Sequence, residues 1–178
     1  MTTFLISLGI TAVIFIVFWV LLNLGEWIQS KISFLHDPVY VPSTAKAIAT
    51  MLVLANPKAD QIVIDLGSGD GRLLLAFAQK GCLCIGYEIN PVLVWKSREL
   101  AKKHHLQDKM QFYCKSFWLA DLSTADTLVL FMTESIMDRL EKKVHVEVKQ
   151  GAKVVSQRFR FPTWKISKKI ADCCLYIR

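Results

Sequence analysis

The sequence predicts an α/β domain with a mostly parallel sheet, preceded by a single apolar helix. From residue 44 onward, short runs rich in β-branched and apolar residues alternate with helical segments. This is the pattern of parallel strands with helices on both faces of the sheet. Three glycines follow the first of these runs, where the first strand ends. A long apolar stretch opens the chain.

Residues 1–25 predict a transmembrane anchor. No charged residue occurs between Thr2 and Gly25, and the almost wholly apolar run of residues 4–24 would span about 30 Å as a helix, the thickness of a bilayer core. A buried core helix would show a polar stripe, and the run is too long for the apolar region of a cleaved signal peptide. Lys31 and Lys46 follow the run and no basic residue precedes it. The positive-inside rule therefore places the rest of the chain on the cytoplasmic side of a bacterial inner membrane, or on the matrix side of the mitochondrial inner membrane.

Residues 26–42 are expected to form a juxtamembrane connector, and residues 43–178 the folded domain. The connector ends in two prolines, Pro38 and Pro42, which favour extended backbone before them. Ser43 is the expected N-cap of a helix over residues 44–55.

The domain continues as alternating strands and helices. Periodicity and β-branched content predict strands at residues 61–66, 82–88, 109–114, 126–133, 152–159 and 173–178. Capping signals predict a helix that ends at Gly81, a helix that begins after Asn90 with Pro91 in first position, and a helix that ends near Gly151. These helices cover residues 71–80, 90–105 and 134–150.

The positive charge is concentrated at the C-terminus. The net charge is +7, and the last 40 residues carry 11 basic and only three acidic side chains. This segment is either a solvated basic face or a surface that lies against anionic lipid headgroups. No nucleic-acid recognition motif accompanies it. The five cysteines form no C-x-x-C pair, which predicts reduced, buried thiols and no metal site.

The glycines of the first strand–helix turn predict a ligand site. Gly67, Gly69 and Gly71 form a G-x-G-x-G pattern around Ser68, which is neither the dinucleotide fingerprint nor a phosphate loop. Without Cβ atoms this loop can adopt positive φ and let a ligand contact its backbone. Asp65 precedes the loop by two residues. Its carboxylate would repel a pyrophosphate and suits a cationic ligand, such as an amino acid that carries an ammonium and a sulfonium.

A second acid lies at the end of the next strand. Glu88 follows Gly71 by 17 residues, and an acid in this position accepts hydrogen bonds from both hydroxyls of a ribose. Strand, G-x-G-x-G, helix, strand and acid together resemble the Rossmann-like class I methyltransferases, which implies S-adenosylmethionine as cofactor. The alternative is a degenerate nucleotide pocket without activity.

The same resemblance gives roles to the segments that follow the third and fourth strands. Ser116 and the backbone of Phe117 are expected to hold the adenine, with Trp118 nearby; for both aromatic rings, core packing is the alternative. Thr133 and Glu134 lie where the methyl acceptor enters, although an acid at a helix N-terminus is also favourable by itself. The fourth strand does not end in the N/D-P-P-Y motif of enzymes that methylate amino groups of nucleic acids, so a nucleic-acid partner is not expected.

Four stretches carry a closer resemblance. Residues 40–43, 65–72, 86–99 and 140–164 resemble the small lysine methyltransferases that modify the c-ring protein of ATP synthase and the adenine nucleotide translocase, and the archaeal protein lysine methyltransferases. The likeness extends over residues 38–165. It implies N-methylation of protein lysines, here on a membrane-embedded protein at a lipid bilayer.

The resemblance also implies where transfer occurs. Tyr40, Val41 and Pro42 are expected near the cofactor or the acceptor lysine, with Tyr40, Phe131 and Thr133 as the candidate catalytic residues. Aromatic walls that include Phe117 would bind the incoming ammonium by cation–π contact, and burial would lower its pKa. A methyltransferase of lipids or small molecules and a non-catalytic assembly factor that binds S-adenosylmethionine are the alternatives.

Overall fold

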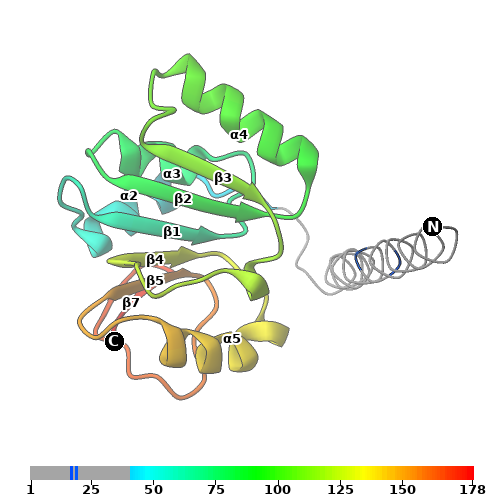
Figure 1. The fold of residues 1–178 in the computed structure, drawn as a ribbon. Helices are drawn as coiled ribbons and strands as arrows, with labels where there is room; N and C mark the ends of the chain where they lie inside the picture. The colour runs from blue at the N-terminus through cyan, green and yellow to red at the C-terminus, as the bar shows by residue number, and fades with distance from the viewer. Residues whose placement is uncertain (1–16, 18, 20–40) are drawn as a thin grey trace, which may run out of the picture. The chain divides into compact units, whose positions relative to one another are not determined.

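A computed structural model describes residues 41–178, together with Val17 and Trp19 (Figure 1). The predicted anchor, apart from those two residues, and the connector up to Tyr40 lie outside the described residues. In the part of the chain that is described, no helix combines the length and the apolar character needed to cross a bilayer. Residues 38–178 belong to one compact unit, and the described part of that unit holds the fold and the pocket.

The described residues form a seven-stranded sheet in the order β3-β2-β1-β4-β5-β7-β6. The first five strands are parallel to their neighbours, and β7 is antiparallel to both β5 and β6. The strands are β1 (Ile62–Leu66), β2 (Leu83–Glu88), β3 (Met110–Cys114), β4 (Thr127–Leu130), β5 (Lys153–Gln157), β6 (Lys168–Ile170) and β7 (Cys173–Ile177). The mostly parallel sheet is therefore confirmed, and its order reverses between β1 and β4, the position at which ligands bind in such sheets.

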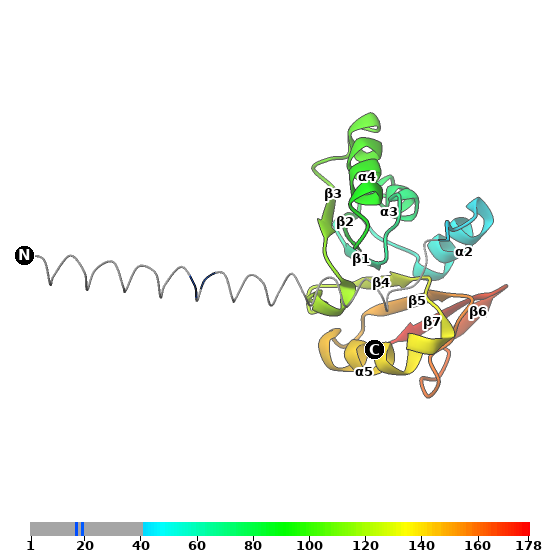
Figure 2. The ribbon, with the colours of Figure 1, turned by 90° about the vertical axis from the view of Figure 1, so that its right-hand side faces the viewer.

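Helices cover both faces of the sheet, as predicted (Figures 1 and 2). On one face lie α2 (Ala45–Ala55), α3 (Arg72–Ala78) and α4 (Pro91–Lys103), and on the other lies α5 (Glu134–Glu147). Alternate strand residues supply the two cores, because successive side chains of a strand point to opposite faces. In β1, Val63 packs toward α2 and α3, whereas Ile64 packs toward α5.

The start of the first helix differs from the prediction. Thr44, not Ser43, is the N-cap of α2, and its Oγ1 accepts a hydrogen bond of 3.2 Å from the backbone N–H of Ala47. The Ser43 hydroxyl instead donates to Oε1 of Gln157 at 2.9 Å. The prediction of Ser43 as cap is therefore wrong, and Ser43 joins the segment before α2 to the end of β5.

Two predictions about strands also needed correction. The fourth strand ends at Leu130, so Phe131, Met132 and Thr133 lie in the connection to α5. The three-residue strand β6 was not predicted, because two of its residues are lysines and it is too short to show a period. The predicted C-terminal strand is confirmed as β7.

Two glycines allow the loop after β1 to pack closely. A Cβ on Gly71, which has φ +82° and is the N-cap of α3, would lie 3.0 Å from both the Phe112 ring and Ser97 Cβ. A Cβ on Gly86 would lie 2.6 Å from Ser68 Oγ. The glycine loop therefore rests directly on β2, β3 and α4.

Replacing Gly71 by alanine should destabilise the domain beyond the effect of its backbone conformation. Gly151 is a matched control, since its φ is +80° and a Cβ there would meet nothing within 4 Å. We expect Gly151→Ala to cost about 1–2 kcal/mol for the left-handed backbone, and Gly71→Ala to cost about 1–3 kcal/mol more for the contacts. Free energies of unfolding from urea denaturation measure both; equal losses would contradict this packing argument.

Candidate active site

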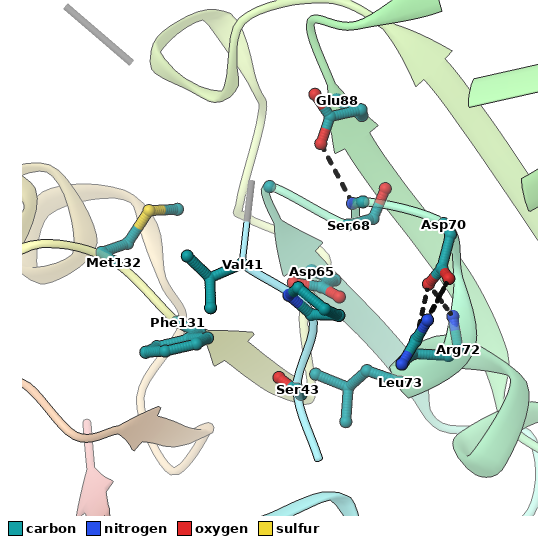
Figure 3. Close-up of a pocket in the computed structure, with 13 residues that line it drawn as sticks. Val41, Ser43, Asp65, Ser68, Asp70, Arg72, Leu73, Glu88, Phe131 and Met132 are labelled. Carbon is teal, nitrogen blue, oxygen red and sulfur yellow. Dashed lines mark hydrogen bonds and ion pairs between the residues drawn. The ribbon is translucent and has the colours of Figure 1, made fainter. Parts of the chain in front are cut away.

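A pocket open to solvent, with about 580 Å³ of empty space, lies at the carboxyl ends of β1 and β4 (Figure 3). The position is the one that the reversal of strand order predicts. Its lining comes from the segment before α2, the glycine loop, the start of α3, the end of β2 and the connection after β4: Val41, Pro42, Ser43, Asp65, Gly67, Ser68, Gly69, Asp70, Arg72, Leu73, Glu88, Phe131 and Met132.

Hydrogen bonds from β2 hold the glycine loop in place. The backbone N–H groups of Gly67 and Ser68 both donate to the carbonyl of Tyr87 at 2.9 Å. The Glu88 carboxylate accepts from the backbone N–H of Gly69 at 3.0 Å and, through its other oxygen, from Asn90 at 2.9 Å. Glu88 therefore shapes the pocket as well as facing it, a role that sequence reasoning did not identify.

The carboxylate of Asp65 is buried without a donor. Asp65 is only 3% exposed, and no hydrogen bond to its side chain occurs within residues 41–178. Burial, and secondarily the negative charge of Glu88, raise the pKa of Asp65 to about 8. A buried carboxyl in this state gains most from a cationic partner, because a positive charge beside it favours the ionised form.

The loop also holds an unpaired hydroxyl. Ser68 Oγ is buried and has no hydrogen-bond partner in the part of the chain that is described. Gly67 and Gly69 have φ of +85° and +55°, the left-handed region that favours glycine.

Most of the predicted cofactor residues meet at this pocket. The lining contains Val41, Pro42, Asp65, Gly67, Ser68, Gly69, Glu88 and the candidate catalytic residue Phe131. Figure 3 shows Asp65 in the middle, with Val41 and Phe131 to one side and Asp70 and Arg72 to the other. The roles assigned to these residues stay predictions, since their placement alone does not test them.

Four of the predicted residues do not line the pocket. Gly71 caps α3, and Thr133 is exposed at the start of α5, with its hydroxyl 3.1 Å from that of Ser135. Ser116 is buried and caps the short 3-10 helix η1 (Phe117–Leu119), accepting from the N–H of Trp118 at 3.4 Å. Phe117 packs in the core beneath α5.

Trp118, proposed beside the adenine, contacts a cation from α5 instead. The guanidinium carbon of Arg139 lies 4.0 Å from the centroid of its ring. Glu134, the other acceptor-side candidate, is the first residue of α5 and is exposed. Tyr40 lies outside the described residues.

Sequence reasoning missed five lining residues. Asp70, Arg72 and Leu73 directly follow the glycines, and attention to every side chain of the loop would have found them. Ser43 and Met132 carried no signal, because they reach the pocket only through tertiary packing. Ser97, whose hydroxyl lies 2.9 Å from the Gly69 carbonyl, supports the loop from α4.

Solved structures with this fold are methyltransferases that bind a product of S-adenosylmethionine. An RNA methyltransferase from Salinibacter ruber, in complex with S-adenosyl-L-homocysteine, aligns with a TM-score of 0.72 at 30% identity over 76% of this chain and 91% of that chain. A SAM-dependent methyltransferase from Geobacter sulfurreducens, also in complex with S-adenosyl-L-homocysteine, aligns with a TM-score of 0.58 over 66% of this chain and 49% of that chain, and its 16% identity shows the fold alone. Fold and pocket together define the class I, S-adenosylmethionine-dependent methyltransferases.

The family is more specific than the class. A family model described as the ANTKMT methyltransferase domain matches residues 65–168, so the chain belongs to this family. The lysine N-methyltransferase that is named for the c-ring protein of ATP synthase in Xenopus laevis is 38% identical over 125 residues, 70% of this chain and 55% of that protein. The protein-lysine N-methyltransferase of Saccharolobus islandicus is 30% identical over 131 residues, 72% of this chain and 81% of that protein. The chain spans about half the length of the ATP synthase methyltransferases of vertebrates that it matches.

The residues of the pocket fit the cofactor of this class. Asp65 offers a buried carboxylate to an ammonium, and Glu88 faces the same pocket from the end of the neighbouring strand, where an acid binds ribose hydroxyls. The glycine loop exposes backbone between the two carboxylates. The prediction of S-adenosylmethionine as cofactor is thus confirmed for the family and agrees with the lining of the pocket.

Asp65→Asn should change how stability depends on pH. The raised pKa means that the folded state keeps a proton on Asp65 between about pH 4 and about pH 8, whereas the unfolded state has released it. Stability without cofactor should therefore fall as pH rises through this range, by up to about 1.4 kcal/mol per pH unit. Urea denaturation across the range should show this fall in the wild type and in the exposed control Asp108→Asn, but not in Asp65→Asn. Parallel curves for all three proteins would refute the assignment.

Glu88→Ala should weaken cofactor binding. The change removes the acceptor for the N–H groups of Gly69 and Asn90 as well as the expected partner of the ribose. Hydrogen bonds to a charged group contribute about 1.5–3 kcal/mol each, so calorimetry with S-adenosylhomocysteine should show a loss of affinity of about tenfold or more. Glu99→Ala removes an exposed carboxylate on α4 and should bind normally. Unchanged affinity of Glu88→Ala would place the ribose elsewhere.

Proposed function

We propose that the chain is a membrane-anchored, S-adenosylmethionine-dependent protein-lysine N-methyltransferase that acts on a membrane-associated protein. The observation that carries the proposal is the pocket, which has two buried carboxylates at the ends of β1 and β2 and an apolar wall after β4. Relatives with 30–38% identity, whose names describe lysine N-methyltransferases of an ATP synthase component or of proteins in general, support lysine as the acceptor.

The two sides of the pocket divide the work of the reaction. When bound, S-adenosylmethionine supplies a methyl group activated by a sulfonium. Asp65 and Glu88 would bind its ammonium and ribose, while the glycine loop contacts it through backbone. Holding donor and acceptor within reach of each other accounts for much of the rate in such transfers.

The apolar side would prepare the acceptor amine. A free lysine has a pKa near 10.4, so only about 1 in 2,000 molecules is neutral at pH 7. Val41, Pro42, Phe131 and Met132 line this side, and an apolar wall disfavours the ammonium relative to the amine. The half-buried Phe131 ring can bind the ammonium by cation–π contact as it arrives. The proposal assigns no dedicated base.

Membrane anchoring rests on residues 4–24, whose length and apolar character match a bilayer span. Such an anchor would confine the domain to the cytoplasmic face of a bacterial inner membrane, or to the matrix face of a mitochondrial one. It would also raise the local concentration of acceptors in the same bilayer, which is why a membrane protein is the proposed substrate.

RNA is a second candidate acceptor. The Salinibacter ruber neighbour, at 30% identity, is titled an RNA methyltransferase, and the C-terminal segment of this chain is strongly basic. The sequence after β4, Phe131-Met132-Thr133-Glu134, lacks the motif typical of enzymes that methylate amino groups of bases. We therefore favour the protein acceptor.

One labelling experiment separates the candidates. Membranes and total RNA from cells without this protein are incubated with the purified full-length chain and S-adenosylmethionine labelled in the methyl group. Label in a protein band, abolished by prior chemical blocking of lysines, is the expected result. Label in RNA or in lipid extract would overturn the lysine assignment, and binding of S-adenosylhomocysteine without any transfer would indicate a non-catalytic factor. Asp65→Asn should lose the label, and Asp108→Asn should retain it.

A further inference from the structure

The charges that line the pocket are unevenly matched to a zwitterion. Among the lining residues that the structure describes, Asp65, Asp70 and Glu88 are acids and Arg72 is the sole base. The methionine end of the cofactor carries an ammonium and a carboxylate on the same carbon atom. If the ammonium lies against Asp65, the carboxylate must lie within a few bond lengths of it, in a region where two other acids would repel it.

Arg72 is placed to offset that repulsion. It is the first residue of α3, immediately after Gly71, whose packing fixes the start of the helix. Figure 3 shows its side chain beside Asp70, on the side of the pocket opposite Phe131. A guanidinium binds a carboxylate through two parallel N–H donors, which gives both orientation and affinity.

Asp70 orients the guanidinium. Its two oxygens accept from Arg72 Nε at 2.9 and 3.0 Å, and one also accepts from Nη2 at 2.6 Å. The Arg72 and Asp70 side chains are 46% and 23% exposed. An ion pair with this much exposure is weak, so the guanidinium can bind a second carboxylate without a large loss.

We propose that Arg72 binds the carboxylate of the methionine end of the cofactor, with Asp70 as its positioning residue. The proposal rests on the proposed function, because it takes S-adenosylmethionine as the ligand. It goes further in assigning the pocket a test for the amino-acid end: Asp65 recognises the ammonium and Arg72 the carboxylate. Adenosine sulfur compounds that lack the carboxylate should therefore gain nothing from Arg72.

Calorimetry with three ligands and matched variants tests this assignment. The ligands are S-adenosylhomocysteine, its decarboxylated analogue, which keeps the amine, and 5′-methylthioadenosine, which lacks both groups. For the purified full-length chain, Arg72→Gln should weaken S-adenosylhomocysteine by about 10- to 100-fold, the range for hydrogen bonds to a charged group. The other two ligands should change by less than about twofold. Arg72→Lys, which keeps the charge without the planar fork, should be intermediate.

Two further variants complete the design. Lys80→Gln removes an exposed cation just beyond α3 and outside the pocket lining, and should bind all three ligands like the wild type. Asp70→Asn should weaken S-adenosylhomocysteine less than Arg72→Gln does, with the same preference among ligands. Thermal unfolding of each variant checks that the fold is retained.

The outcomes are distinguishable from failure of the proposed function. Equal weakening of all three ligands by Arg72→Gln would show a general effect on the loop and overturn the assignment. Unchanged binding of S-adenosylhomocysteine would overturn it as well, while leaving the cofactor intact. If the wild type bound none of the three ligands, the cofactor itself, and with it the proposed function, would fall.

Discussion

The hydrogen bonds of one carboxylate, that of Glu88, are the constraint on which the pocket depends. One oxygen accepts from Gly69 in the loop after β1, and the other accepts from Asn90 at the start of α4. A side chain at the end of β2 thus joins the loop to the neighbouring strand and helix. Without an acceptor there, the N–H of Gly69 would be buried and unpaired, at a cost of about 1–3 kcal/mol.

This arrangement leaves the pocket electrostatically incomplete. Glu88 and Asp65 contribute negative charge to one region, and Asp65 has no donor within residues 41–178. The resulting rise in the pKa of Asp65, to about 8, means that the empty pocket holds a proton there at neutral pH. A ligand with a positive end can take the place of that proton, so binding and proton release are coupled. Strongly shifted pKa values of this kind are concentrated at functional sites.

The sequence predicted the acidic side of the pocket well and the rest less well. Asp65, the glycines and Glu88 could be placed because chain order alone brings the ends of β1 and β2 together. Ser43 and Thr44 are both good capping residues, and the choice depends on Gln157, which is 114 positions away in the chain. Ser116 and Phe117 directly follow β3, yet the chain there turns into a 3-10 helix that buries both side chains. Such outcomes depend on packing that no local pattern encodes.

The polarity of the pocket changes from one wall to the other, and this change suits amine methylation. A sulfonium and a lysine ammonium repel each other, so the acceptor must approach as a neutral amine. The acids lie on the strands before the reversal of sheet order, whereas Phe131 and Met132 follow β4 on the other side of it. The donor can therefore be held by charge while the acceptor enters along an apolar wall that favours its neutral form. A pocket with acids on both walls would hold the donor as firmly but would keep the acceptor protonated.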